Sequence, residues 1–299
     1  MPIPESQLET WSHQGSIRQS SETYNSLKNV LESRANPYSE KSFKVFLQGS
    51  YGNDTNIHAE SDVDIIIRLD ECFYSDIDSL SEAEKEGYKN AFVDAGYGYA
   101  EFKRDVLSAL KSHYGAAIRP GDKAIVVDSN SSRRKSDVIV ATKFRRYFRF
   151  PSPSDAEFAE GICFFNGQGE RIANYPEQHS ANLTTKHQAT NQWLKPMARV
   201  FKNMRNRMID IGLIESGIAP SYYIEGLLYN VPTERFGSSY QRSMYSIFDW
   251  YQREASKLDL VCANEQYYLL RDNCHTCWPQ KNCDSFVEAA IELWNNWPA

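Results

Sequence analysis

The sequence lacks any run of about 18 apolar residues, which is the shortest stretch that suits a membrane-spanning helix. Its first residues, Met1 to Glu5, also lack the basic cluster and the apolar segment that open a secretory leader. We therefore expect a soluble, cytoplasmic protein without a membrane partner.

An excess of basic residues is missing as well. Lysine and arginine number 33 against 39 aspartates and glutamates, so the formal net charge is -6. Proteins held to duplex nucleic acid by phosphate contacts usually carry a basic excess or stripe. The dense basic runs, 133–135 and 143–146, are short enough to be solvated strand ends. We expect no activation by duplex nucleic acid.

Cysteine is scarce, with 6 residues in a chain of 299, which argues against a disulfide scaffold. One cluster stands out, formed by Cys274, Cys277 and Cys283, and Cys262 could supply a fourth thiol. Structural zinc sites usually contain two Cys-x-x-Cys pairs, and only one is present. Reduced, partly buried thiols are the default interpretation, and a structural zinc ion at Cys274, Cys277 and Cys283 is the alternative.

What the sequence does contain is a glycine-serine turn followed by a strand with two carboxylates. The turn lies in Phe46 to Tyr51, and the strand begins at Asp62-Val63-Asp64 and continues with three isoleucines. Side chains alternate faces along a strand, so Asp62 and Asp64 point the same way, roughly 7 Å apart at the Cα atoms. They would repel each other unless a cation lay between them, and Mg²⁺ suits hard oxygen ligands.

The turn itself suits a phosphate. Gly49 lets the backbone approach closely, and Ser50 adds a hydroxyl and an N–H group at what looks like a helix start. Enzymes of polymerase type use two metal ions about 3.5 to 4 Å apart to stabilise the attacking and leaving oxygens. The expected ligand is therefore a magnesium nucleotide.

Two metal ions call for a third carboxylate on a neighbouring strand, and Asp137 is the best candidate. Its short β-branched segment follows residues 124–127 across a polar loop, as one arm of a hairpin would. Alone, an aspartate before an apolar strand is more often a turn residue. The upstream motif favours the metal-binding interpretation.

The second half of the chain is predicted to be helical. Residues 193–204 carry an apolar stripe at helical spacing, with cations on the other faces. Pro220 marks another helix start with Ser221 as its cap, and free N–H groups there favour an anion. Tyr222 suits stacking on a base, although it could equally be a core aromatic.

These residues carry a resemblance to a known superfamily. Gly49-Ser50-Tyr51, Thr55, Ser61 to Asp64 and Asp137 resemble the signature of the DNA polymerase β-like nucleotidyltransferases. Leu194 to Lys202 and Ser221 to Glu225 narrow the similarity to the branch that holds cGAS, the oligoadenylate synthetases and the bacterial cGAS/DncV-like nucleotidyltransferases (CD-NTases) of CBASS antiphage operons. The resemblance runs from the first helix to about residue 230.

The resemblance implies an α+β fold with two lobes and an active site in the cleft between them. Residues 1–180 would form the catalytic core, a mixed sheet with flanking helices, and residues 181–299 an oligoadenylate-synthetase-like helical domain that binds nucleotide. A long N-terminal helix, about Ser6 to Arg34, would join the lobes as a spine. The pattern also favours one helix from Leu80 to His113 and a hairpin turning at Asn166-Gly167.

The resemblance also implies residue roles. Asp62, Asp64 and Asp137 would bind two Mg²⁺ ions, for which Mn²⁺ could substitute, and Asp137 would accept the proton of the attacking ribose hydroxyl. The remaining implied residues would hold the donor ATP, GTP or other NTP: Gly49 and Ser50 at the turn, Lys202 and Ser221 at the phosphates, and Tyr222 against the base.

The implied product is a cyclic di- or trinucleotide, made with release of pyrophosphate, that acts as an antiviral second messenger and switches on an effector protein. Two alternatives stay open: a linear oligonucleotide synthetase or toxin-like transferase acting on RNA or protein, and an inactive nucleotide-binding regulator. Base identity, linkage and ring size depend on the acceptor pocket, for which Asn166 and Gln168 are candidates.

Overall fold

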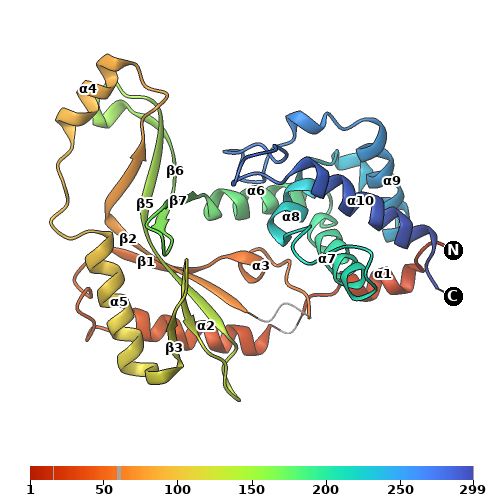
Figure 1. Cartoon of the computed structure of the whole chain (residues 1–299), viewed down its shortest axis with the longest axis horizontal. Coiled ribbons are helices and arrows are strands. Elements are labelled where there is room, and N and C mark those ends of the chain that lie inside the picture. Colours follow the sequence, from red (N-terminus) through yellow and green to blue (C-terminus); the bar gives the residue numbers. More distant parts are fainter. Residues whose placement is uncertain (16, 59–61, 299) are drawn as a thin grey trace. The chain divides into compact units, whose positions relative to one another are not determined.

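The computed structural model describes residues 1–15, 17–58 and 62–298. Contacts within the chain group it into two units (Figure 1). The sheet unit comprises Ile17–Tyr51 and Ser61–Pro176, and the helical unit comprises Met1–Ser16, Gly52–Glu60 and Glu177–Ala299. The division into domains at residues 180 and 181 stays a prediction. The contacts assign the N-terminal residues and the segment after the glycine-serine turn to the helical unit.

The sheet unit is built on a mixed sheet, which in the described residues has seven strands. The strands are β1 (Phe43–Leu47), β2 (Val63–Asp76), β3 (Ile118–Pro120), β4 (Ile125–Val127), β5 (Ser136–Arg149), β6 (Glu157–Phe165) and β7 (Arg171–Asn174). Their order is β1-β2-β5-β4-β3, and β6 pairs with β5 and with β7. Only β2 and β5 pair in parallel among these strands. The predicted hairpins around residues 125–140 and at Asn166-Gly167 are confirmed.

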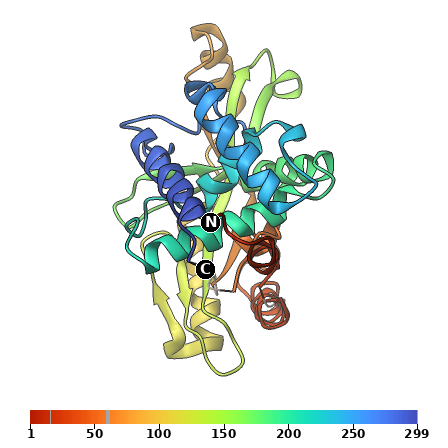
Figure 2. The same ribbon diagram turned by 90° about the vertical axis from the view of Figure 1, so that its right-hand side faces the viewer.

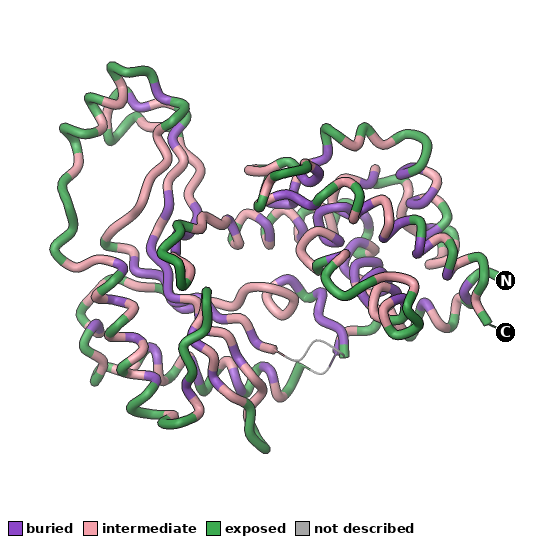
Figure 3. Tube along the Cα trace, in the orientation of Figure 1, coloured by how far each residue is buried: buried purple, intermediate pink, exposed green. Residues whose placement is uncertain are grey.

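The side chains of the long strand β2 alternate between the two faces of the sheet. Val63, Ile65 and Ile67 are fully buried in a core shared with two helices, α2 (Arg18–Leu31) and α5 (Tyr99–Tyr114). Ile66 belongs to a separate cluster on the opposite face, the face to which Asp64 also belongs. Figure 3 shows the buried stretch along β2 and β5. The apolar core therefore holds β2 from one side, and on the other side Asp64 precedes the cluster that contains Ile66.

The helix expected over Leu80 to His113 is two helices, so that prediction is wrong. Helix α4 (Glu82–Ala91) starts with a capping box between Ser81 and Glu84. Helix α5 starts after Gly98, whose N–H donates to the Glu101 carboxylate at 3.2 Å. A glycine-containing stretch, residues 92–98, ends the first helix and allows a second start.

The predicted N-terminal spine helix is also wrong, because two separate helices replace it. Helix α1 (Glu5–Ser12) belongs to the helical unit and α2 to the sheet unit. The chain leaves the first helix at His13, which is extended. Gly15 then donates its N–H to the Asn56 carbonyl at 3.2 Å, and a Cβ there would lie 2.7 Å from the carbonyl carbon of Ile57. This close approach of two backbones requires glycine and interrupts the helix.

The helical unit packs around one large apolar core that includes Phe201, Phe248, Trp278 and Phe286. Its α-helices are α1, α6 (Pro176–Ala189), α7 (Leu194–Asp210), α8 (Ser221–Asn230), α9 (Tyr240–Arg253) and α10 (Gln280–Asn295). Short 3₁₀ turns occur in both units, at Gly115–Ala117, Pro153–Asp155, Thr233–Arg235 and Lys257–Asp259. The two chain ends lie together in this unit, where the Met1 amino group donates to the Asn295 carbonyl at 3.1 Å (Figure 2).

The fold class is confirmed as α+β, with a mixed sheet and a C-terminal helical unit. Among the helices that the structure describes, none is long and apolar enough to cross a membrane.

Candidate active site

The glycine-serine turn lies against a carboxylate of β2. Helix α3 (Gly49–Gly52) begins directly after β1, and Gly49 has a φ of +66°, which favours glycine. A Cβ on Gly49 would overlap the Asp64 Oδ2 atom. The Gln48 N–H donates to the Asp64 backbone carbonyl at 3.0 Å. Glycine is therefore required here for two reasons, the backbone angle and the proximity of Asp64.

The register of the two parallel strands brings a second carboxylate to the same place. Asp64 on β2 pairs directly with Asp137 on β5, so their side chains share one face of the sheet. Asp62 lies two residues before Asp64 and forms an ion pair with Lys135. Ser61, which belongs to the same sequence motif, lies outside the described residues. The structure thus brings together Gly49 and the three aspartates within the sheet unit.

Asp137 is a half-buried carboxylate in an unfavourable setting. Burial raises the pKa of Asp137, the Lys135 ammonium opposes this shift, and the charge of Asp62 adds to it. Among the described residues, its buried Oδ1 atom has no hydrogen-bond partner. The hydrogen bond to Asp62 raises the pKa of Lys135, with the neighbouring aspartates acting in the same direction. A carboxylate oxygen without a partner beside other carboxylates is a natural cation ligand.

The donor set of this site fits Mg²⁺. Mg²⁺ binds through one or two carboxylates and completes its coordination with water and substrate phosphates. Asp64 and Asp137 match that requirement, and the unpartnered Oδ1 of Asp137 supports it. No group of three or more His, Cys, Asp or Glu side chains in the described residues is arranged to hold a metal by itself.

Three predicted nucleotide-binding residues lie in the helical unit, and Lys202 is the most deeply enclosed of them. Its side chain is 0% exposed. The ammonium lies 2.8 Å from the Glu225 carboxylate and donates to the Thr55 carbonyl and hydroxyl oxygens, both at 3.1 Å. These contacts match the three donors of a lysine. A contact between Lys202 and a phosphate stays a prediction. To make it, the ammonium would have to exchange one of its three present partners for the phosphate.

Ser221 is the first residue of α8, and Pro220 occupies the cap position. The prediction of Ser221 as the cap is therefore wrong. Its hydroxyl accepts from Arg205 Nη1 at 2.9 Å, and the same nitrogen donates to the Ala219 carbonyl at 3.2 Å. Arg205 thus places a guanidinium at the start of α8, where an anion is already favoured.

One face of the Tyr222 ring is covered by another ring. Its ring stacks on His179 of α6, with 4.8 Å between centroids and 19° between planes. The hydroxyl accepts from Asn264 Nδ2 at 2.9 Å. Burial raises the pKa of Tyr222, so it stays neutral at physiological pH. The role of Tyr222 in base stacking is untested and stays a prediction.

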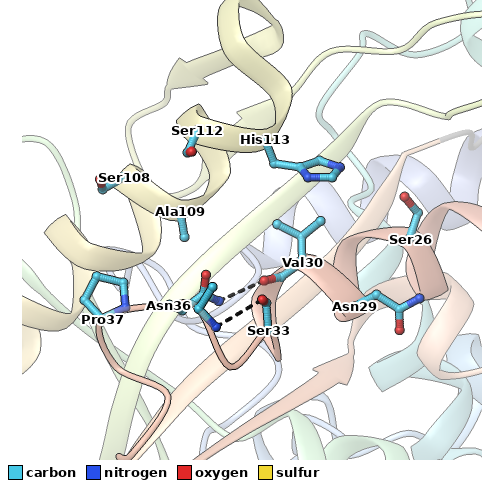
Figure 4. A pocket seen from close by; sticks show the side chains of 11 residues that line it. Ser26, Asn29, Val30, Ser33, Asn36, Pro37, Ser108, Ala109, Ser112 and His113 are labelled. Carbon is cyan, nitrogen blue, oxygen red and sulfur yellow. Dashed lines mark hydrogen bonds between the residues drawn. The ribbon is translucent and has the colours of Figure 1, made fainter.

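The residues suggested for an acceptor pocket lie in the hairpin between β6 and β7. The Asn166 Oδ1 atom accepts from the N–H groups of Gln168 and Glu170, at 3.1 and 2.8 Å, and so closes the turn. A groove of about 660 Å³ lies elsewhere in the sheet unit, between α2 and α5 (Figure 4). Its lining, which includes Ser33, Asn36 and His113, contains none of the predicted site residues.

The cysteine cluster does not form a three-ligand metal site in the part of the chain that the structure describes. Cys274 and Cys277 lie side by side, with 2.9 Å between sulfurs. Cys283 is on α10 and instead accepts from the Tyr251 hydroxyl at 3.2 Å. The choice of reduced thiols over a zinc ion stays a prediction.

Sequence reasoning missed Glu225 and His179. Glu225 belongs to the sequence segment that carried the resemblance, but no role was assigned to it. The available signal was a charged residue between two apolar residues, Ile224 and Leu227, in a segment expected to be helical. A carboxylate in such a position needs buried partners, although the sequence does not say which.

The chain is similar to known proteins along its whole length. Residues 181–295 match the cGAS/DncV-like nucleotidyltransferase C-terminal helical domain. The cyclic UMP-AMP synthase of Rhodothermus marinus is 35% identical over 299 residues, which cover 99% of each chain. The cyclic dipurine nucleotide synthase of Elizabethkingia meningoseptica is 33% identical over 271 residues, covering 90% of this chain and 91% of that protein.

A solved structure extends the similarity to three dimensions. The Rhodothermus marinus CdnE c-UMP-AMP synthase, solved with Apcpp and Upnpp, superposes with a TM-score of 0.89 at 34% identity. The alignment covers 100% of this chain and 98% of that one.

Proposed function

Because the chain belongs to the CdnE-type cGAS/DncV-like nucleotidyltransferases, which are cyclic nucleotide synthases, we propose that it joins two nucleoside triphosphates into a cyclic dinucleotide and releases pyrophosphate. The observation that carries this proposal is the pairing of Asp64 with Asp137 on parallel strands, with the Gly49 turn against Asp64. This arrangement offers acidic oxygen ligands and an accessible backbone at one place, as a magnesium nucleotide requires.

We assign the metal-binding role to Asp62, Asp64 and Asp137, with two Mg²⁺ ions as the expected cofactors and Mn²⁺ as a substitute. Bound metal would neutralise charge on the attacking and leaving oxygens. Asp137 would accept the proton of the attacking ribose hydroxyl. Its raised pKa supports this role, since a carboxylate with a higher pKa is a stronger base.

We also assign the residues that would hold the donor nucleotide. Gly49 and Ser50 would offer backbone N–H groups to its phosphates. Ser221 lies at the start of α8 beside the Arg205 guanidinium, which supports a phosphate contact there. Tyr222 would stack on the base, and Lys202 is kept as a predicted phosphate contact. Arg205 is a new candidate for the same role.

The relatives make products with different bases, so their names do not determine the bases of this product. The Rhodothermus protein is named for uridine and adenosine and the Elizabethkingia protein for two purines, at 35% and 33% identity to this chain. We propose an antiviral role in which the product switches on an effector protein, as the family resemblance implies. A cyclic product is favoured over linear synthesis or transfer to RNA or protein because both relatives are cyclic nucleotide synthases. Independence from duplex nucleic acid stays a prediction.

The test is incubation of the purified protein with all four radiolabelled NTPs and Mg²⁺ or Mn²⁺, followed by phosphatase, thin-layer chromatography and mass spectrometry. We expect a phosphatase-resistant cyclic dinucleotide that is absent when Asp62→Ala and Asp64→Ala are combined. Label that stays sensitive to phosphatase would overturn cyclisation. The same product from the double variant would overturn the assignment of the site.

A further inference from the structure

The segment that follows the glycine-serine turn is embedded in the helical unit. Asn53, Thr55, Asn56 and Ile57 are all buried, although three of these four side chains are polar. Asn56 is held through Gly15, which donates its N–H to the Asn56 carbonyl at 3.2 Å. A buried polar segment of this kind persists only where partners satisfy its hydrogen bonds.

The main partner of this segment is the carboxylate of Glu225 on α8, which is 3% exposed. One carboxylate oxygen accepts from the Thr55 hydroxyl at 2.5 Å and faces the Lys202 ammonium at 2.8 Å. The other accepts from the Asn53 amide at 3.1 Å and lies 2.8 Å from His179 Nε2. Both oxygens therefore have two partners each, which fills the accepting capacity of a carboxylate.

Cations on α7 reinforce the same segment. Lys202 contacts both Glu225 and the Thr55 backbone, so the carboxylate and its ammonium hold Thr55 from two sides. Lys195 forms an ion pair with Asp54 at 3.1 Å, and Arg199 donates to the Asp54 carbonyl at 2.5 Å. Two cations thus hold the backbone of residues 54–55, and a third holds the Asp54 side chain.

The same carboxylate also supports the predicted base-stacking ring. His179 touches Glu225 with Nε2 and presents its ring face to Tyr222. A hydrogen bond at Nε2 restrains rotation of the imidazole, and the imidazole in turn restrains the phenol ring. Burial opposes ionisation of Glu225, but Lys202 and His179 hold its pKa well below the usual range, so it is charged at neutral pH.

We propose that Glu225 is a positioning residue of the nucleotidyl transfer, which orients the Asn53–Thr55 segment, Lys202 and, through His179, the ring of Tyr222 for the donor nucleotide. This inference rests on the proposed function. Glu225 itself is not predicted to touch the nucleotide or the reacting atoms. It acts through residues that are predicted to touch the nucleotide, and through the Asn53–Thr55 segment, which follows the Gly49-Ser50 turn in the sequence.

The decisive measurement is nucleotide affinity in a folded Glu225→Gln variant, which keeps the size of the side chain and removes its charge. Binding of Apcpp with Mg²⁺ is measured by calorimetry below the unfolding transition, and KM and kcat are measured on the same preparation. We expect KM and the dissociation constant of Apcpp to rise about tenfold or more, because the groups that hold the donor lose their orientation. A purely structural role would lower the melting temperature and leave both constants unchanged.

The matched control is Asp284→Asn, which removes another carboxylate of the helical unit. Asp284 pairs with Lys257 at 2.6 Å and accepts from the Tyr251 hydroxyl at 2.8 Å, and none of these residues is predicted to bind nucleotide. We expect this variant to lose stability while its KM stays within about twofold of the wild type. A similar rise of KM in both variants would overturn a specific role for Glu225.

If Glu225→Gln does not fold, Thr55→Val answers the same question, because it removes the hydroxyl contacts with Glu225 and Lys202 and leaves the Lys202–Glu225 pair in place. A rise of KM of about threefold to tenfold is expected, and unchanged nucleotide affinity in this folded variant would overturn the inference. The proposed function and the role of Glu225 are refuted by different results. Wild-type protein that binds no Apcpp and no other NTP refutes the proposed function, whereas normal binding in both wild type and variants refutes only the role of Glu225.

Discussion

Asp137 in the sheet unit is half-buried and Glu225 in the helical unit is buried, and the surroundings of the two carboxylates are opposite. Asp137 has a buried oxygen without a hydrogen-bond partner in the described residues, and its pKa is raised, chiefly by burial. Glu225 has partners on both oxygens, and its pKa is lowered against the effect of burial by Lys202 and His179.

The difference shows which carboxylate lacks partners for its oxygens within the protein. A carboxylate that is satisfied by its own protein stabilises the fold, whereas one that is left unsatisfied costs stability until a ligand arrives. Glu225 belongs to the first kind and Asp137 to the second. The comparison predicts that neutralising substitutions at the two positions have opposite effects on stability.

The largest effect is expected from combining Asp62→Ala with Asp64→Ala. Losing these ligands should lower the rate of product formation by about 10³-fold or more, since metal ions contribute several kcal/mol of charge stabilisation in the transition state. Initial rates of product formation with saturating NTP measure the loss. Circular dichroism should report an intact fold, and a folded variant with wild-type rates would contradict the assignment.

Glu225→Gln should lower the free energy of unfolding by about 3 to 5 kcal/mol, because it leaves the buried Lys202 ammonium without its counter-charge. Urea denaturation followed by fluorescence measures the change. Asp284→Asn should cost only about 1 kcal/mol or less, since its ion pair with Lys257 is partly exposed. Equal losses in the two variants would mean that the Glu225 network is no tighter than a surface pair.

Acid should narrow the difference between wild type and Glu225→Gln. The folded pKa of Glu225 lies below its unfolded value, so the stabilisation is fully present above the unfolded pKa and is lost as pH falls toward the folded one. Below about pH 4.5 the wild type should lose about 1.4 kcal/mol per pH unit from this group, while the variant lacks that contribution. Urea melts at several pH values test this, and a constant difference down to pH 3 would argue against an ionised Glu225.

The smallest effect on stability is expected from Asp137→Asn, and it has the opposite sign. Removing a charge that burial and Asp62 both disfavour should raise the melting temperature of the metal-free protein by a few degrees, about 1 to 3 °C. Scanning calorimetry in EDTA measures the shift, and synthesis should be lost in the same variant. A lower melting temperature in EDTA would show that Asp137 is already satisfied without a ligand.

Much of the catalytic strand could be predicted because its signals are local. The alternation after Asp62 places Val63 and Ile65 on the core face and Asp64 on the other, and the structure has this arrangement. The prediction of a single N-terminal helix failed because its break is set by the approach of Gly15 to Asn56, 41 residues later in the chain. Sequence periodicity carries no information about such a contact.

By itself, the sequence determined the strand that carries Asp62 and Asp64, the glycine turn before it and the helix that begins at Ser221, since these depend on neighbours along the chain. Only the tertiary structure decided that Asp137 pairs with Asp64 and that Glu225 binds Thr55. Thr55 and Glu225 are 170 residues apart, and their partnership follows from the packing of α7, α8 and the segment after the turn. Burial forces such groups to find partners, but the fold alone chooses which ones.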